Sequence, residues 1–240
     1  MMGVIMASLA DSVVLVTGAN GGLGTEFVRQ ALARGARRVY ATARKPRDWD
    51  EDRVVPLALD VTDPASVAAA AVAAADTTIV INNAGRGARG TLLATPLEEV
   101  RALYETNVFG PIAVAQAFAP VLAENGGGAL IDVHSALSWL ATPGAYSSTK
   151  AALWSVTNTL RIELAAQSTQ VVGAHLGYTD TPLTAGLEVD KADPRDIVAV
   201  IYDGLEAGEN EVLADDTSRW VKQNLSQPLT ALYPQLTAAK

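Results

Sequence analysis

A tyrosine and a lysine four residues apart, Tyr146 and Lys150, are the side chains best suited to acid–base chemistry in this 240-residue chain. They begin a segment with helical spacing, so both lie on one helical face and can contact the same ligand. Tyrosine has a reference pKa of about 10, and a nearby positive charge stabilises its phenolate form. The pair therefore predicts a tyrosine that exchanges a proton with a ligand near neutral pH.

A glycine-rich turn near the start of the chain is typical of a phosphate site. Residues 13–16 predict a strand buried on both faces, and Gly18, Gly22 and Gly24 follow it. These glycines allow a sharp turn, close approach of the backbone to a pyrophosphate, and tight packing of the next helix. Because a helix N-terminus offers unpaired N–H groups, the turn predicts a dinucleotide site, with a purely structural turn as the alternative.

The end of the second predicted strand indicates which dinucleotide binds. Arg44 follows residues 38–43, where an acidic residue would bind the ribose of NAD or an arginine the 2′-phosphate of NADP. The preceding residue is Ala43, so no carboxylate repels a phosphate there, and Lys45 lies beside Arg44. We expect NADP(H) as the cofactor. The alternative is that Arg44 and Lys45 form an ordinary solvated pair.

The elements that must position these residues alternate along the chain. Predicted strands cover residues 13–16, 38–43, 54–59, 77–81, 129–133, 171–175 and 211–214. Helical patterns follow the glycine turn and cover residues 65–75, 95–122, 146–166 and 193–207. The alternation predicts an α/β domain with a Rossmann-type, doubly wound parallel sheet of about seven strands, flanked by helices on both faces. Ligands of such a sheet bind at the carboxyl ends of its strands.

Composition limits the number of domains and the classes of partner. With 49% hydrophobic residues, we expect one domain over residues 12–240, preceded by a flexible leader over residues 1–11. A net charge of -8 disfavours nucleic acid and membrane surfaces as partners. The absence of cysteine excludes disulfides and thiol catalysis and suits a cytoplasmic location. His134 and His175 lack helical spacing with carboxylates, so no metal site is predicted.

Taken together, several segments resemble the short-chain dehydrogenase/reductases, from about residue 12 to the end of the chain. The segments are Thr17-Gly18-xxx-Gly22-x-Gly24, Asn82-Asn83-Ala84-Gly85, Asn107, Ser135 and Tyr146-xxx-Lys150. Each of them stands at the end of the appropriate predicted element. The resemblance implies an oxidoreductase that transfers a hydride between a nicotinamide and a carbonyl or alcohol carbon.

The resemblance implies catalytic roles for Asn107, Ser135, Tyr146 and Lys150. Tyr146 would give its proton to a carbonyl oxygen during reduction and take it back during oxidation, while Lys150 stabilises its phenolate. Ser135 would hold the oxygen, and Asn107 would position a water that links Lys150 to solvent. The interval from Ser135 to Tyr146 is shorter than is common in the family, but Ser135 still fits better than Ser138.

The resemblance also implies the cofactor contacts. Asp60 and Val61 would contact the adenine, while Thr181 and the backbone at Thr179 would hold the carboxamide. The implied cofactor-binding residues are Gly18, Asn20, Gly22, Leu23, Gly24, Arg44, Asp60, Val61, Asn83, Ala84, Gly85, Tyr146, Lys150, Thr179 and Thr181.

Apolar residues near Tyr146 in the predicted fold indicate the substrate. Trp139 and Leu140 follow Ser135, and three more, Tyr178, Leu183 and Leu187, lie in residues 177–192, where this fold places a mobile lid. Residues 176–189 contain no arginine or lysine that could hold a carboxylate or phosphate. We therefore predict an uncharged, largely apolar ketone or secondary alcohol. Alternatively, these residues pack on the core or on a neighbouring subunit.

The prediction is thus an NADP(H)-dependent carbonyl reductase that also works in reverse as an alcohol dehydrogenase. A non-catalytic NADP(H)-binding redox sensor is the alternative, although a sensor would have little need for Ser135, Tyr146 and Lys150. Residues 107–122 and 146–166 carry apolar and small residues on more than one helical face, which predicts a homodimer or homotetramer.

Overall fold

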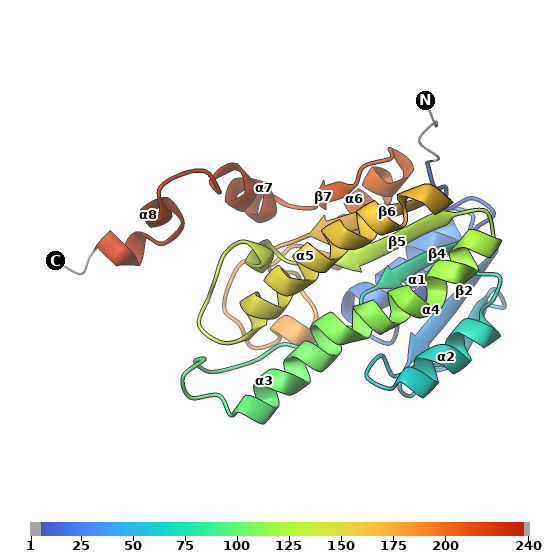
Figure 1. Cartoon of the computed structure of the whole chain (residues 1–240), viewed down its shortest axis with the longest axis horizontal. Coiled ribbons are helices and arrows are strands. Elements are labelled where there is room, and N and C mark those ends of the chain that lie inside the picture. Colours follow the sequence, from blue (N-terminus) through green and yellow to red (C-terminus); the bar gives the residue numbers. More distant parts are fainter. Residues whose placement is uncertain (1–5, 238–240) are drawn as a thin grey trace.

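A single parallel sheet forms the centre of the computed structural model, which describes residues 6–237 (Figure 1). Its strand order is β3-β2-β1-β4-β5-β6-β7. The strands are β1 (Val13–Thr17), β2 (Arg38–Ala43), β3 (Val54–Ala58), β4 (Ile79–Asn82), β5 (Gly128–Val133), β6 (Thr169–His175) and β7 (Glu211–Leu213). All neighbouring strands pair in parallel. The predicted doubly wound, seven-stranded sheet is confirmed.

Helices cover both faces of this sheet (Figure 1). One face carries α1 (Gly22–Ala33) and α6 (Pro194–Glu206), and the other carries α2 (Pro64–Ala73), α4 (Gly110–Glu124) and α5 (Tyr146–Glu163). A π-helical turn, η1 (Glu105–Phe109), joins α3 (Leu97–Tyr104) to α4. The predicted helix over residues 95–122 is therefore one helical run with a local irregularity.

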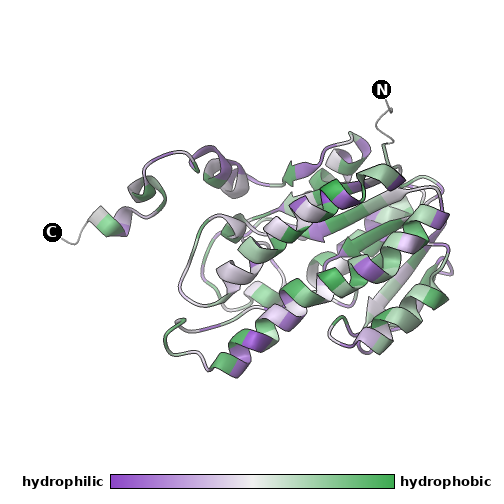
Figure 2. Ribbon diagram, viewed as in Figure 1, coloured by the Kyte–Doolittle hydropathy of each residue, from purple (hydrophilic) through white to green (hydrophobic). Residues whose placement is uncertain are grey.

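The central strand β1 is buried on both faces, as its unalternated apolar sequence predicts. Val14 and Val16 belong to the core beneath α1 and α6, whereas Val13 and Leu15 belong to the core beneath α2 and α4. Figure 2 shows hydrophobic residues running along the central strands. A strand with two apolar faces holds its carboxyl end at a fixed position between the two helix layers.

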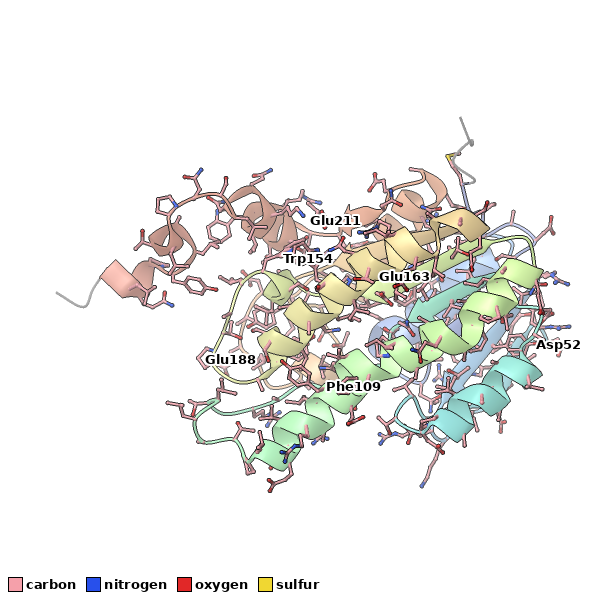
Figure 3. All side chains as sticks on the ribbon, viewed as in Figure 1. Asp52, Phe109, Trp154, Glu163, Glu188 and Glu211 are labelled. Carbon is pink, nitrogen blue, oxygen red and sulfur yellow. The ribbon has the colours of Figure 1, made fainter. Side chains whose placement is uncertain are left out.

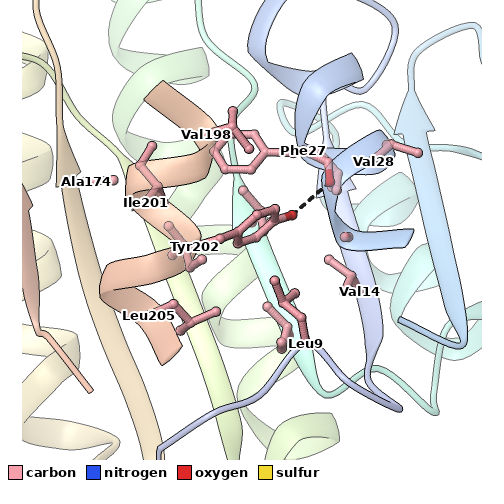
Figure 4. Packing of buried hydrophobic residues seen from close by; sticks show 14 of the residues in the cluster. Leu9, Val14, Phe27, Val28, Ala174, Val198, Ile201, Tyr202 and Leu205 are labelled. Carbon is pink, nitrogen blue, oxygen red and sulfur yellow. Dashed lines mark hydrogen bonds between the residues drawn. The ribbon is translucent and has the colours of Figure 1, made fainter. Parts of the chain in front are cut away.

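The packing of α6 against α1 centres on Tyr202 (Figure 4). Its fully buried ring meets Phe27 edge to face, with ring centroids 5.5 Å apart. Its hydroxyl donates a 2.8 Å hydrogen bond to the Phe27 carbonyl oxygen, so the polar end of the side chain is paired inside the core. This contact fixes the helix that begins at the glycine turn.

The segment before β1 corrects one expectation. Residues 1–5 of the predicted leader lie outside the described residues, but Leu9 is fully buried in the core beneath α1 and α6. Its backbone N–H donates to Glu206, and that of Ala7 donates to Gln170. Residues 6–11 are therefore part of the folded domain, because burial of Leu9 and these hydrogen bonds hold them in place.

Of residues 6–237, one helical region, Leu97–Glu124, is long and apolar enough to cross a membrane. Half of its most apolar window is buried inside the protein, as in a core helix.

Beyond β7, the chain continues through α7 (Asp216–Gln223) and α8 (Leu229–Leu232), which lead away from the sheet in Figure 1. Tyr233 returns to the domain, since its hydroxyl accepts a 2.8 Å hydrogen bond from the N–H of Ala141.

Candidate active site

The carboxyl ends of β1, β2, β4, β5 and β6 border one cavity of about 1840 Å³. Sites for drug-sized molecules measure roughly 300–1,000 Å³. The cavity is therefore large enough for a dinucleotide and a second, smaller molecule. Its position at the strand ends is the one expected for ligands of a doubly wound sheet.

The glycine turn forms one wall of the cavity. Gly18 and Gly22 have φ angles of +67° and +48°, which a residue with a side chain rarely adopts. A Cβ on Gly24 would stand 2.2 Å from the Gly18 carbonyl oxygen, so only glycine lets the helix start pack on the turn. Gly22 also begins α1, whose first turn, within the described chain, has neither a side-chain cap nor an acidic residue. Its N–H groups are suited to bind an anion.

Hydrogen bonds join the end of β4 to the end of β1. The Thr17 hydroxyl accepts hydrogen bonds from the N–H groups of Asn83 (3.0 Å) and Ala84 (2.9 Å). The Asn83 side chain donates to the Thr17 carbonyl oxygen at 2.8 Å. These bonds hold Ala84 and Gly85 along the cavity wall, where both residues line it.

The end of β2 brings positive charge to the same cavity. Arg44 and Lys45 are exposed and line it. The Asn20 side chain donates a 2.7 Å hydrogen bond to the Lys45 carbonyl oxygen, so it ties this segment to the glycine turn. At the end of the neighbouring strand β3, hydrogen bonds from Thr62 and the charge of Arg44 lower the pKa of Asp60. Arg44 is therefore placed where an arginine could bind the 2′-phosphate of an adenosine.

Tyr146 and Lys150 occupy the first turns of α5, and both line the cavity. The Lys150 ammonium lies 5.8 Å from the Tyr146 ring centroid and donates a 2.7 Å hydrogen bond to the Val133 carbonyl oxygen. Burial lowers the pKa of Lys150 to about 8 and raises the pKa of Tyr146. Tyr146 is therefore a phenol that can donate a proton.

Ser135 lines the cavity at the end of β5, whereas Ser138 is buried outside it. The Ser135 hydroxyl accepts a 3.1 Å hydrogen bond from the N–H of Leu137 and caps the 3-10 turn Ala136–Ser138. The geometry therefore favours Ser135 over Ser138 as the serine beside Tyr146.

Asn107 lies beneath the cavity and is fully buried in the π-helical turn η1. Its carboxamide accepts from the N–H of Arg86 and donates to the Arg86 carbonyl oxygen, both at 2.8 Å. It also donates to the Thr149 hydroxyl at 3.1 Å. Asn107 therefore joins the loop after β4 to α5, one residue before Lys150.

The predicted substrate contacts divide into two groups. Leu140, Tyr178, Leu183 and Leu187 line the cavity. Trp139 does not: its indole stacks on His175 at 3.9 Å, and the Lys222 ammonium lies 4.5 Å from its centroid. This placement corrects the prediction for Trp139, because an aromatic and cationic stack holds the ring against β6 and α7.

The predicted lid segment lies beside the loop after β4, and both line the cavity. A Cβ on Gly87 would meet Leu183 at 3.0 Å, and one on Gly22 would meet Thr181 at 3.0 Å. Backbone hydrogen bonds link Asp180 and Tyr178 to Ala192. The segment thus contacts both the glycine turn and the β4 loop.

Most predicted site residues meet at this cavity; Gly24, Asn107 and Trp139 are the ones that do not line it. Arg86, Thr217 and the buried Asp132 were missed. Arg86 directly follows the Asn82–Gly85 motif, a position that signals a cavity residue. Thr217 comes from α7, and no local sequence signal connects it to the site.

The residues present fit a nicotinamide dinucleotide. Gly22 offers an uncapped helix start, Arg44 offers a cation, and the buried Thr179 hydroxyl has no hydrogen-bond partner among residues 6–237. A cofactor amide is a suitable partner for that hydroxyl. Within the same part of the chain, no group of three or more His, Cys, Asp or Glu side chains could hold a metal ion.

Comparison with known proteins identifies relatives in one family of dehydrogenases and reductases. The short chain dehydrogenase model matches residues 12–192. An uncharacterized oxidoreductase of Staphylococcus aureus is 31% identical over 213 residues, which cover 82% of this chain and 92% of that protein. A short chain dehydrogenase from Burkholderia cenocepacia, solved in complex with NADP, is 36% identical with a TM-score of 0.90 and covers 95% of this chain and 99% of its own. A 3-ketoacyl-(acyl-carrier-protein) reductase from Brucella melitensis, complexed with NADH, is 25% identical with a TM-score of 0.78 and covers 85% and 96%.

The fold and the cavity at its strand ends define a Rossmann-type α/β protein. The chain belongs to the short-chain dehydrogenase/reductase family of oxidoreductases.

Proposed function

We propose that this protein is an NADP(H)-dependent carbonyl reductase, reversible as an alcohol dehydrogenase, that acts on uncharged, largely apolar ketones and secondary alcohols. The observation that carries the proposal is the meeting of Ser135, Tyr146 and Lys150 in a cavity that also contains the glycine turn and Arg44. The arginine and the NADP bound by the B. cenocepacia relative support NADP(H) over NAD(H).

When bound, the reduced cofactor would supply the hydride that is added to the carbonyl carbon, and the oxidised cofactor would accept the hydride that the alcohol carbon loses. Gly18, Gly22 and Arg44 would bind its phosphates. Ser135 donates a hydrogen bond to the carbonyl oxygen and orients it toward Tyr146. Tyr146 donates its hydroxyl proton to that oxygen, and Lys150 stabilises the phenolate by its positive charge.

The chemistry of the cavity near Tyr146 supports an apolar substrate. Leu140, Leu183 and Leu187 line this region together with Tyr178. Arg86 also lines the cavity, so a cation is present as well. We assign Arg86 to the cofactor side because its backbone is held to Asn107 directly after the Ala84–Gly85 wall.

The direct test is a panel of cyclic and aryl ketones, keto acids and secondary alcohols, each assayed with both cofactors. We expect oxidation of NADPH with the uncharged ketones and reduction of NADP⁺ with the corresponding alcohols. A protein that binds NADPH tightly but converts no member of the panel would support a redox sensor instead.

A further inference from the structure

Behind Lys150 lies a buried carboxylate to which the proposed mechanism assigns no role. Asp132, in β5, is fully buried and precedes Val133, whose carbonyl oxygen accepts the Lys150 hydrogen bond. The Thr157 hydroxyl donates a 2.6 Å hydrogen bond to one carboxylate oxygen, and the Asn82 side chain donates a 2.9 Å hydrogen bond to the other. Two donors facing its two oxygens favour the ionised form of Asp132.

Two positively charged side chains act on Asp132, and they differ in burial. Lys150 and Arg161, both on α5, favour its ionised form, and Lys150 is the buried one of the two. Burial raises the pKa of Asp132, and the two hydrogen bonds and two cations oppose this increase. A buried carboxylate without a nearby cation would be costly, and the positive charges of Lys150 and Arg161 oppose the loss of the Asp132 charge.

Two histidines near this pair carry no charge at neutral pH, whereas Glu211 and Lys222, which form a 2.7 Å ion pair with each other beside His175, are charged. His134, after β5, and His175, in β6, are buried, and burial lowers the pKa of each. The His134 ring lies 3.0 Å from the Thr157 hydroxyl, so it belongs to the same hydrogen-bonded group. Tyr146 remains protonated because burial raises its pKa.

We propose that Asp132 is the counter-ion of Lys150 and a positioning residue for the reaction: its carboxylate keeps the Lys150 ammonium charged at the end of β5, beside Tyr146. The catalytic consequence rests on the function proposed above, whereas the charge interaction between Asp132 and Lys150 does not. Without the carboxylate, burial acts unopposed on Lys150, which then loses its proton at a lower pH. The neutral amine no longer stabilises the Tyr146 phenolate.

The charge interaction between Asp132 and Lys150 can be tested directly in the protein without added cofactor. The chain contains five lysines, so NMR of protein labelled with ¹³C at the lysine ε-carbon gives few signals, and Lys150→Arg identifies the one of interest. We expect the wild-type Lys150 to titrate near pH 8. Asp132→Asn should lower that pH by at least one pH unit. Asparagine has nearly the same shape, and it can still accept from Asn82 and donate to Thr157.

Two further variants separate the charge from general disruption. Thr157→Val removes one donor but keeps the carboxylate, and it should lower the Lys150 titration less than Asp132→Asn does. Asp76→Asn is the matched control. Its carboxylate pairs with Arg38 and Tyr40, and its loss should leave Lys150 unchanged.

The outcomes distinguish this inference from the proposed function. A wild-type Lys150 that titrates below about pH 6.5 overturns the proposed charge interaction even if neither variant folds, as does an Asp132→Asn protein in which Lys150 titrates as in wild type. If wild type reduces ketones and Asp132→Asn has the same pH profile of kcat, the positioning role is wrong and the reductase stands. If wild type reduces no ketone, the proposed function is wrong, while a lower Lys150 titration in Asp132→Asn still supports the charge interaction.

Discussion

The Lys150 ammonium donates a 2.7 Å hydrogen bond to the Val133 carbonyl oxygen. This bond joins the start of α5 to the last residue of β5 and leaves the ammonium 5.8 Å from the Tyr146 ring centroid. The cation thus acts on the phenol from a fixed position. The geometry of the strand end and of the helix start decides its effect on Tyr146.

Cofactor preference depends on the end of β2. A bidentate, charge-assisted contact between Arg44 and a 2′-phosphate is worth about 1.5–3 kcal/mol, or about 10- to 150-fold in affinity. Ala43→Asp combined with Arg44→Ala should therefore erode or reverse a preference for NADPH. The ratio of kcat/KM for NADPH and NADH measures the change. Equal use of both cofactors by the unmodified protein would make Arg44 an ordinary surface residue.

Substrate preference is expected to follow Tyr178 rather than Trp139. Tyr178 is 42% exposed and lines the cavity, so Tyr178→Ala should lower kcat/KM for bulky ketones while the fold stays intact. Trp139→Ala should instead destabilise the protein, by about 3 kcal/mol, because it removes the ring that stacks on His175. Kinetics and urea unfolding of both variants test this division. Faster turnover of keto acids than of apolar ketones would argue against the pocket.

Acid should destabilise the protein through its buried histidines. The His175 ring stacks between His134 and Trp139, and burial lowers its pKa to about 4. The unfolded chain binds this proton near pH 6.5, so the free energy of unfolding falls as pH decreases from about 6.5 to about 4. The loss attributable to His175 is at most about 3 kcal/mol.

The variant His175→Phe keeps a flat ring in the stack and removes the titrating group. Unfolding in urea at several pH values should show a shallower decrease in stability than in wild type, with His134 supplying the remainder. Identical pH dependence in the two proteins would show that His175 is not the group responsible.

Self-association is expected through the helices on the α4 and α5 face. Phe109, labelled in Figure 3 and the last residue of η1 before α4, is 52% exposed, and Ile162 near the end of α5 is 79% exposed. Light scattering should find a dimer or tetramer of the 25.0 kDa chain, and Phe109→Lys with Ile162→Glu should weaken it. A wild-type species of one chain at micromolar concentration would contradict this expectation.

Local sequence patterns predict the features that depend on neighbouring residues. Gly18 and Gly22 require positive φ angles, and α5 sets the spacing of Tyr146 and Lys150, so each could be inferred without a structure. Parallel topology then brings the strand ends together. The local motifs and the parallel strand order together are enough to predict most of the residues that line the cavity.

Features that depend on distant contacts could not be predicted in this way. The apolar character of Leu9 and Trp139 does not say which partner each one meets. Leu9 meets the core beneath α6, and Trp139 meets His175 and Lys222. For the same reason, the hydrophobic run of β5 gives no sign that Asp132 lies within hydrogen-bond distance of Thr157 on α5.

Replacement of Tyr146 by phenylalanine tests the proposed reaction most directly, because it removes the proton donor and keeps the ring. Tyr178→Phe is the matched control, since it removes a second tyrosine hydroxyl from the same cavity. We expect Tyr146→Phe to reduce kcat by roughly 10²-fold or more while the Kd for NADPH stays nearly unchanged, and Tyr178→Phe to keep most of the activity. Near-normal turnover by the Tyr146→Phe protein would contradict Tyr146 as the acid–base residue.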